Sequence, residues 1–501
     1  MELAGLEIVS AYVPVLISLV IVGLLFHIFS SATQSDEPPG PRPLPLLGNL
    51  LMMEFSQPDR TYAQLAQKYG PVFTFHMGPK KMVVIVGHRA VREALVDYSE
   101  EFGERDVLTT VKESNLEYGI IFANGEKWRE MRRFALTNLR DFGMGKKACE
   151  DKIREESSHL VHLLKSFRGE PFDTNGIVNA SVSNIICSMV FGKRFEYDDP
   201  EFKAMVYRAC RSVQLSGTRS VQLYQVFPSI GRWISKARAE IRNNGLANRS
   251  LHTQKIDQSK KTLDPHMSRG FIDSFLIKQQ QLQAAGGDVG EFHSQNLLAA
   301  VGNMFVAGTE TTSSTLRWIL LYMAKYPHIQ DQVREEIMRV IGAREVQCQD
   351  RKDLPYTDAV IHETQRLGNI VPLNLPHRTS RDVTFRGYFI KKGTPVIPVL
   401  ASVLYDESEW EKPHEFHPAH FLDKEGKFKK RDAFMPFSAG RRACVGESLA
   451  RMELFLFFVT LMQNFRFTAP AGVTEEELDL GAQIGTTRCP KPHKLCAVSI
   501  L

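Results

Sequence analysis

The chain has 501 residues, of which 43% are hydrophobic and 24% are charged, so its composition is that of a globular protein and excludes a disordered or fibrous one. Its net charge of +5 is too small to indicate a nucleic-acid-binding protein, and the sequence contains no nucleic-acid-binding motif. The seven cysteines are dispersed without C-x-x-C spacing, which argues against a disulfide framework and against a zinc site.

The N-terminal segment is predicted to be a membrane anchor. Residues 8–29 contain no Lys, Arg, Asp or Glu, and about 22 residues at about 1.5 Å each span roughly 33 Å, enough to cross the hydrocarbon core. The alternative is a cleaved signal peptide, which would begin with basic residues, whereas Glu2 and Glu7 precede this stretch. The first basic residue beyond it is Arg42, which places the C-terminal side in the cytosol. We expect the anchor to comprise residues 1–31.

A proline-rich segment follows, reading Pro-Pro-Gly-Pro-Arg-Pro at 38–43. Such a sequence cannot be helical and tends to be stiff and extended, so residues 32–49 are expected to form a linker that orients the body against the membrane. Residues 50–501 are expected to form one catalytic domain. Apolar β-rich runs at 72–75 and 82–86 predict a small sheet, and much of the rest has helical periodicity.

Polar stretches at 254–265 and 279–290 are interpreted as exposed connections between helices. The C-terminal region, 465–501, mixes Pro, Gly and short alternating runs, which predicts loops and hairpins.

A long apolar helix is predicted over residues 295–326, and its middle reads Ala-Gly-Thr-Glu-Thr-Thr at 307–312. Threonine and glycine are poor helix formers, so their presence in a core helix needs another reason. The hydroxyl of Thr311 can bond to the carbonyl of Ala307 four residues earlier, which would bend the helix and leave a groove for a small ligand. Gly308 would permit the close approach of a flat cofactor. The alternative is ordinary packing between helices.

The ten residues at 437–446 read Phe-Ser-Ala-Gly-Arg-Arg-Ala-Cys-Val-Gly and precede an apolar helical run. A cysteine that ligates haem iron must stay deprotonated, accept hydrogen bonds from backbone N–H groups and be shielded from water. Gly440 and Gly446 would let the backbone approach the sulfur of Cys444, and Phe437 could cover it. A lone cysteine is more often a small buried hydrophobe, but five matched positions favour the ligand interpretation.

This stretch is similar, position for position, to the haem-binding signature of the cytochrome P-450 monooxygenases. Together with residues 191–195, 307–312 and 376–379, it resembles the animal microsomal branch that oxidises drugs, fatty acids and related lipids. The resemblance implies a mainly α fold with a minor β region, a triangular helical prism, behind the N-terminal transmembrane helix. It implies location on the cytosolic face of the endoplasmic reticulum membrane.

The resemblance also implies a reaction and its partners. Haem b would be the cofactor, and one oxygen atom from O2 would be inserted into a lipophilic substrate such as a fatty acid, a steroid or a xenobiotic, by hydroxylation or epoxidation. Electrons would come from NADPH through a P-450 reductase, with cytochrome b5 as a second expected electron-transfer partner. The alternatives are a haem-thiolate isomerase or dehydratase of lipid peroxides, against which Glu310 and Thr311 argue, and a non-catalytic haem sensor or electron carrier.

By the same resemblance, Cys444 is the axial iron ligand, and Glu310 and Thr311 relay protons during oxygen activation. Trp128 and Arg132, which share one helical face, would bind the haem propionates with two further donors. The expected haem-binding residues are Cys444, Trp128, Arg132, His377, Arg442, Arg105, Phe437, Gly440, Gly446, Ala307 and Gly308, with Arg105 in a less well matched loop.

Three further sets of residues have expected roles. Glu363 and Arg366 would be a surface ion pair by spacing alone, but the resemblance places them in the core with His420, in a network made sparser by Ala419. A basic patch of Lys127, Arg129, Arg133 and Arg441 is expected to attract an acidic electron donor, or else to be a solvated charge run. The substrate pocket is expected to be apolar and to draw on residues 107–121, Met304, Phe305, Ala307, 371–375 and 484–487.

Overall fold

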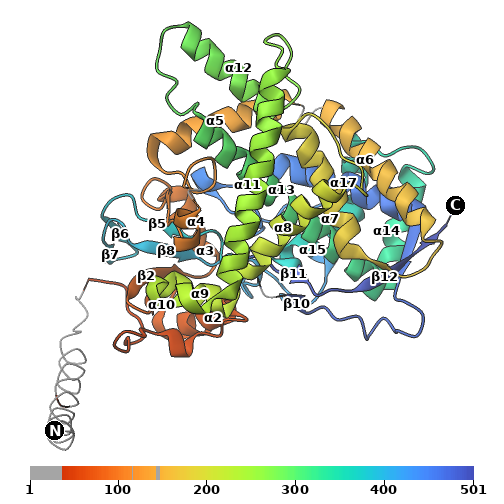
Figure 1. Cartoon of the computed structure of the whole chain (residues 1–501). Helices are drawn as coiled ribbons and strands as arrows, with labels where there is room; N and C mark the ends of the chain where they lie inside the picture. The colour runs from red at the N-terminus through yellow and green to blue at the C-terminus, as the bar shows by residue number, and fades with distance from the viewer. Residues whose placement is uncertain (1–17, 19–35, 115–116, 143–146, 484, 501) are drawn as a thin grey trace, which may run out of the picture.

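The computed structural model describes Ser18 and residues 36–114, 117–142, 147–483 and 485–500. Helices make up most of this part, and the strands form small sheets (Figure 1). The mainly α fold with a minor β region is therefore confirmed. The expected anchor lies outside the described residues apart from Ser18, and no helix within the described ranges is long and apolar enough to cross a membrane.

The centre of the molecule is α13 (Ser294–Lys325), a helix of 32 residues that confirms the long helix predicted there. It is buried along most of its length, which its apolar sequence favours, and it ends just before Pro327, where a helix-breaking ring begins the next element. The helices that pack most extensively against it are α7 (Thr174–Val190), α8 (Pro200–Ser216), α11 (Lys236–Lys261), α15 (Pro355–Gly368) and α17 (Glu447–Asn464).

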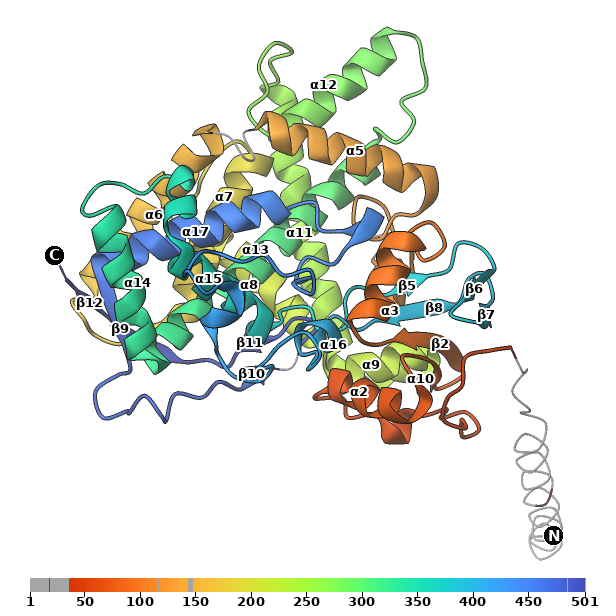
Figure 2. The same cartoon turned by 180° about the vertical axis from the view of Figure 1, so that it is seen from behind.

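The remaining helices surround this core (Figure 2). The surrounding helices are α2 (Pro58–Tyr69), α3 (His88–Arg92), α4 (Thr109–Glu113), α5 (Gly125–Asp141), α6 (Lys147–Ser166), α9 (Arg219–Val226), α10 (Pro228–Ile234), α12 (Phe271–Ala284), α14 (Pro327–Val340) and α16 (Ala401–Leu404). Sequence signals mark the start of several helices in the core and around it. Asp199 caps α8 by accepting from two backbone N–H groups, and α14 and α15 begin with proline at their first position.

The largest sheet has five strands in the order β1-β2-β8-β5-β3. The predicted runs at 72–75 and 82–86 lie in its antiparallel hairpin, β1 (Val72–Met77) with β2 (Lys80–Ile85), which confirms the small sheet. The other strands are β8 (Pro395–Pro398), β5 (His377–Arg378) and β3 (Glu104–Arg105). The pairing of β3 with β5 sets Arg105 directly opposite His377, although 272 positions separate them in the sequence (377 minus 105).

The C-terminal region forms strands and hairpins, as predicted. A three-stranded sheet joins β4 (Phe172–Asp173), β12 (Lys494–Ser499) and β9 (Phe465–Thr468), and β10 (Ala482–Gln483) pairs with β11 (Cys489–Pro490). The last pair is β6 (Val383–Phe385) with β7 (Tyr388–Ile390).

Two expectations about connections are corrected. Residues 254–261 belong to α11 and residues 279–284 belong to α12, although their polar composition predicts loops. Tertiary contacts override that composition, because α11 packs on α8 and α13 and Lys255 pairs with Glu201 at 2.8 Å.

The described part of the expected linker, 36–49, is attached to the catalytic body. The backbone N–H of Thr74 in β1 donates to the carbonyl of Pro39 at 2.7 Å, and the Thr74 hydroxyl donates to the carbonyl of Pro38 at 2.9 Å. A side chain at Gly40 would collide with the Thr74 carbonyl, so glycine is required there. The proline segment thus fixes where the chain enters the domain.

Candidate active site

The loop before α17 holds Cys444 in a defined environment. The backbone N–H of Cys444 donates to the carbonyl of Phe437 at 3.0 Å, and the N–H of Gly446 bonds to the sulfur. Burial raises the pKa of the Cys444 thiol, whereas the Gly446 hydrogen bond and Arg132 lower it. Although protein atoms surround the Cys444 thiol, the residue has accessible surface and is the one exposed cysteine of the seven, all of which are described.

Gly440 serves this loop differently from the expectation. It adopts a φ of +69°, and a side chain there would collide with the backbone carbonyl of Leu95. The glycine is therefore needed for a tight turn packed against a neighbouring segment and not for the approach of backbone to the sulfur. Gly446 matches the expectation, because its backbone lies against the Cys444 sulfur.

A buried cationic cluster lies beside this loop and consists of five residues: Arg105, Trp128, Arg132, His377 and Arg442. The Arg442 guanidinium lies 3.8 Å from the centre of the Trp128 ring, and Arg132 lies 5.7 Å from the same ring. Arg132 donates to the carbonyl of Ala443 at 2.7 Å, next to Cys444. Members from four separate parts of the chain, β3, α5, β5 and the cysteine loop, thus meet at one place.

The cluster has more donors than the protein uses. Four side-chain nitrogens are buried without a hydrogen-bond partner: Arg105 Nε, Trp128 Nε1, His377 Nε2 and Arg442 Nη1. None of the three arginines forms a salt bridge with any carboxylate in the described ranges. Leaving buried polar atoms unpaired costs about 1–3 kcal/mol each, so their concentration at one site points to a missing anionic group.

The electrostatics of the cluster agree with that conclusion. Burial and repulsion from the neighbouring arginines lower the pKa of Arg442 to about 8, and burial and Arg132 lower the pKa of Arg105 to about 9. The pKa of His377 is lowered well below its usual range by burial and by Arg105. Two carboxylates placed here would offset the repulsion and accept from the unpaired donors, which is the fit expected for the propionates of haem.

On the middle of α13, Ala307 and Thr311 form an accessible strip in an otherwise buried helix. The Thr311 hydroxyl donates to the carbonyl of Ala307 at 2.7 Å, which confirms the predicted i to i−4 bond. Ala307 is exposed and Thr311 half-buried, whereas Thr309, Glu310 and Thr312 beside them are buried. This strip can therefore face a ligand.

Gly308 does not lie on that strip. A side chain at this position would collide with Ile186 of α7, so the glycine permits two helices to approach each other. The expectation that Gly308 makes room for a flat cofactor stays a prediction.

Glu310 faces the protein interior on a face of α13 adjacent to the accessible strip. It is 3% exposed, and its Oε1 accepts from the Cys489 thiol at 2.9 Å. Burial raises its pKa, while hydrogen bonds from Cys210 and Cys489 and the charge of Arg317 lower it. No hydrogen bond joins Glu310 to Thr311 within the described residues, so the two expected proton-relay groups occupy separate environments.

The predicted substrate-contacting loop is tied to α13 by two buried asparagines. Asn303 Oδ1 accepts from the backbone N–H groups of Ile120 and Ile121, both at 3.0 Å, and Asn296 Oδ1 accepts from Gly119 N–H at 2.7 Å. Phe305, expected in the substrate pocket, is instead fully buried against α11, with its ring 5.7 Å from that of His252.

The Glu363–Arg366 pair lies in the core, as the resemblance implied. Both side chains are fully buried and joined by two bonds of 2.7 Å, and His420 lies 3.2 Å from the same carboxylate. The network is not sparse, because the backbone N–H of His417 donates to Glu363 at 2.8 Å.

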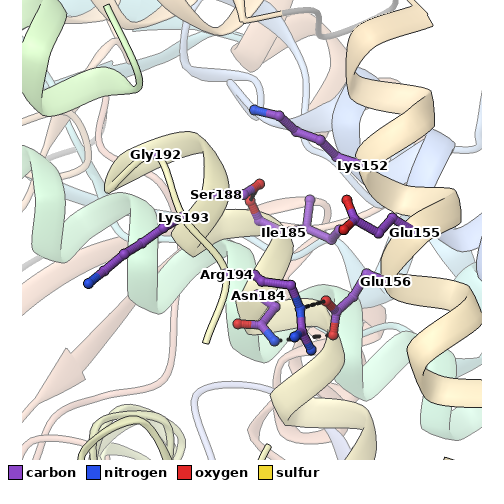
Figure 3. A pocket seen from close by; sticks show the side chains of 9 residues that line it. All are labelled: Lys152, Glu155, Glu156, Asn184, Ile185, Ser188, Gly192, Lys193 and Arg194. Atoms are coloured by element: carbon purple, nitrogen blue, oxygen red, sulfur yellow. Dashed lines mark hydrogen bonds and ion pairs between the residues drawn. The ribbon is translucent and has the colours of Figure 1, made fainter. Parts of the chain in front are cut away.

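Two further hollows lie in the described structure. A groove of about 290 Å³ follows α5 and is lined by Trp128, Arg129, Arg132, Arg133, Leu136, Thr137 and Arg140. Arg140, which was not predicted from the sequence, extends the basic face about two helical turns beyond Arg133. A pocket of about 250 Å³ lies between α6, α7 and the loop 192–194, where Arg194 pairs with the buried Glu156 at 3.1 Å (Figure 3). It contains no residue predicted to bind the cofactor.

Cys210 and Cys489 could not be predicted as neighbours of Glu310, since nothing in their spacing relates them to it. Helical periodicity could have indicated Arg140, four residues after Leu136 on the same face.

Comparison with known proteins agrees with the site. Residues 38–497 match the family model described as Cytochrome P450. The chain is 57% identical to Cytochrome P450 2K1 of Oncorhynchus mykiss over 471 residues, which cover 94% of this chain and 93% of that protein. It is 52% identical to Cytochrome P450 2K6 of Danio rerio over 91% of this chain and 90% of that protein. For Cytochrome P450 2B4 of Oryctolagus cuniculus the identity is 44%, over 92% and 94%.

These matches do not favour an isomerase or a non-catalytic haem protein. The protein is a haem-thiolate monooxygenase that takes haem b as its cofactor and acts on lipophilic substrates, and the chain belongs to the cytochrome P450 family.

Proposed function

We propose that Cys444 is the axial ligand of the haem iron and that the buried cationic cluster binds the two propionates. The observation that supports this most directly is the set of four buried nitrogens without partners among mutually repelling cations. The backbone N–H of Gly446 and the charge of Arg132 then stabilise the thiolate against the effect of burial.

The propionate assignment predicts unequal effects of one substitution on two forms of the protein. Arg442→Met removes the hydrogen bonds that Arg442 donates to Gly103, Ala123 and Asn124 in both forms, but it removes a donor to the propionates only in the haem-loaded form. The haem-loaded protein should therefore lose more stability to heat than the haem-free protein, and haem transfer to an acceptor protein should become faster. Arg339→Met is the control, because Arg339 is an exposed arginine on α14, a helix that contributes no residue to the cluster. Equal destabilisation of both forms by Arg442→Met would contradict the assignment.

Thr311 is proposed to act on the accessible face of α13. Haem, when bound, supplies the iron at which O2 is activated. Because the Thr311 hydrogen is directed to the Ala307 carbonyl, the hydroxyl oxygen can accept a hydrogen bond from a proton carrier on that face. Glu310 is proposed to hold a proton in the protein interior beside the accessible strip, since burial favours its neutral form.

The protein is proposed to be anchored at the cytosolic face of the endoplasmic reticulum membrane. Residues 8–29 supply an uncharged N-terminal segment of sufficient length. A second apolar surface supports the proposal: Leu46 is 80% exposed, Leu51 74% and Trp233 87%, and Ile230 and Ile234 flank the tryptophan on α10. Gly78 contacts both the α9–α10 junction and the Leu46 carbonyl, and α10 lies beside α2 in both views (Figure 1, Figure 2).

Tryptophan fluorescence tests this surface in the full chain. Trp233 is the exposed member of the four tryptophans, since Trp128, Trp318 and Trp410 are at most 4% exposed. Bromine-labelled lipids in the bilayer should quench its emission, and the quenching should disappear in Trp233→Phe. Emission that is unaffected by the labelled lipids would contradict insertion of this surface.

The α5 groove is proposed to receive an acidic surface of the NADPH-dependent reductase, with cytochrome b5 as a second partner. Arg133 and Arg140 line the groove and form no salt bridge within the described ranges. Arg133→Glu should slow reduction by the reductase at low salt and reduce the salt dependence of the rate, while reduction by dithionite stays unchanged. Fatty acids, steroids and xenobiotics are the proposed substrates, to be distinguished by a product screen with mass spectrometry.

A further inference from the structure

A charged side chain near the start of α17, one turn after its first residue, connects the cysteine loop to the core. Arg451 lies four residues after Glu447 and pairs with it, with Nε and Nη2 each 2.9 Å from Oε1. Glu447 is the first residue of α17 and follows Gly446, whose backbone lies against the Cys444 sulfur. The Arg451 cation therefore neutralises the carboxylate that lies three residues after Cys444.

Arg451 also faces two aromatic rings of the segment before the cysteine. Its guanidinium carbon lies 5.1 Å from the centre of the Phe437 ring and 5.7 Å from that of Phe434. Phe437 accepts the backbone hydrogen bond of Cys444 through its carbonyl, so its position is coupled to that of the cysteine. A cation at these distances attracts the face of an aromatic ring and restricts its orientation.

A buried histidine fixes the other end of the arginine. Arg451 Nη1 donates to Nε2 of His362 on α15 at 3.0 Å, and His362 Nδ1 donates to the carbonyl of Asp358 at 2.7 Å. His362 is 4% exposed, and the Phe434 ring lies 4.7 Å from it. Burial lowers the pKa of His362, which agrees with the neutral tautomer that both bonds require.

We propose that Arg451 is a positioning residue that sets the electron donation of the Cys444 thiolate, by holding its guanidinium on Phe437 and neutralising Glu447 while His362 fixes its orientation. The proposal rests on the assignment of Cys444 as the iron ligand. Electron donation by an axial thiolate stabilises the oxidised iron, and groups around the sulfur tune it. A cation near the thiolate withdraws electron density from the sulfur, and this favours reduction of the iron.

The test is the midpoint potential of the haem iron in the holoenzyme, measured by redox titration without the reductase. Arg451→Met leaves Glu447 uncompensated, so we expect a more negative potential, with up to about a tenfold lower equilibrium constant for reduction, which is about 59 mV for one electron. Glu447→Gln should shift the potential in the opposite direction. Arg451→Lys retains the charge but not the planar fork, so its shift should be smaller than that of Arg451→Met.

The control is Arg339→Met, an exposed arginine on α14 whose loss should leave the potential unchanged. The proposal is overturned if Arg451→Met and Glu447→Gln both leave the potential at the wild-type value, or both shift it in the same direction. If Arg451→Met binds haem poorly, Glu447→Gln still decides the test, because this variant leaves no buried charge without a partner. Failure of the Cys444 assignment is recognised separately, as the absence of the thiolate Soret band from the wild-type carbon-monoxide complex.

Discussion

The buried carboxyl group of Glu453 on α17 should make the folded protein less stable as the pH rises from mildly acidic to mildly alkaline values. The side chain is 1% exposed and its Oε1 has no hydrogen-bond partner, while Thr312 of α13 bonds to the carboxyl group. Burial raises the pKa of Glu453 from 4.5 to about 8. Between these values the folded protein retains a proton that the unfolded chain releases, so the free energy of unfolding falls as the pH rises.

The magnitude follows from the shift. Each pH unit above 4.5 removes about 1.4 kcal/mol, so the cost is about 1 kcal/mol at about pH 5.5 and about 4 kcal/mol at about pH 8. Glu453→Gln reproduces the shape of the protonated acid without its titration. We therefore expect the variant to be more stable than the wild type, with an advantage that grows by about 3 kcal/mol between those two pH values.

The assay is urea unfolding of the haem-loaded protein at both pH values, with the variant and the wild type compared at each pH so that the contribution of haem cancels. Glu415→Gln is a suitable control, because Glu415 is exposed and pairs with Lys412 on the surface. A stability difference between Glu453→Gln and the wild type that does not change with pH would refute the reasoning.

Three further predictions concern α13. Thr311→Ala should lower product yield and raise hydrogen peroxide release per NADPH consumed, and unchanged coupling would exclude a role for the hydroxyl. Asn303→Ala leaves the buried N–H group of Ile120 unpaired, at about 1–3 kcal/mol, and the part-buried N–H group of Ile121 unpaired at a smaller cost. Hydrogen exchange at Ile120 and Ile121 should therefore accelerate and substrate should dissociate faster, whereas Asn303→Asp keeps an acceptor and should show neither effect. Gly308→Ala should destabilise the protein by about 1–3 kcal/mol, and Ile186→Ala should restore part of the loss if helix packing is the reason for the glycine.

The sequence predicts features that depend on local spacing. The helix that carries Trp128 and Arg132, the Thr311 bond to Ala307 and the hairpin of β1 with β2 all follow from periodicity over a few residues, and the structure contains each of them. The resemblance adds His377 and Arg442, which no local pattern relates to Trp128.

Features that depend on distant contacts are not predictable in this way. The thiol of Cys489 reaches Glu310 across 179 residues, and the polar end of α11 is helical because α8 and α13 support it. Gly308 illustrates the same limit, since a glycine has one sequence signal whether it faces a cofactor or another helix. The neighbours of Glu310 and Gly308 are set by the fold as a whole.

The most direct test of the central claim is the absorption spectrum of the reduced carbon-monoxide complex of the wild type and of Cys444→His. Thiolate coordination by Cys444 predicts a red-shifted Soret band in the wild type and its loss in the variant. A red-shifted band that survives in Cys444→His would contradict the account, because the sulfur bound to iron would then come from another residue.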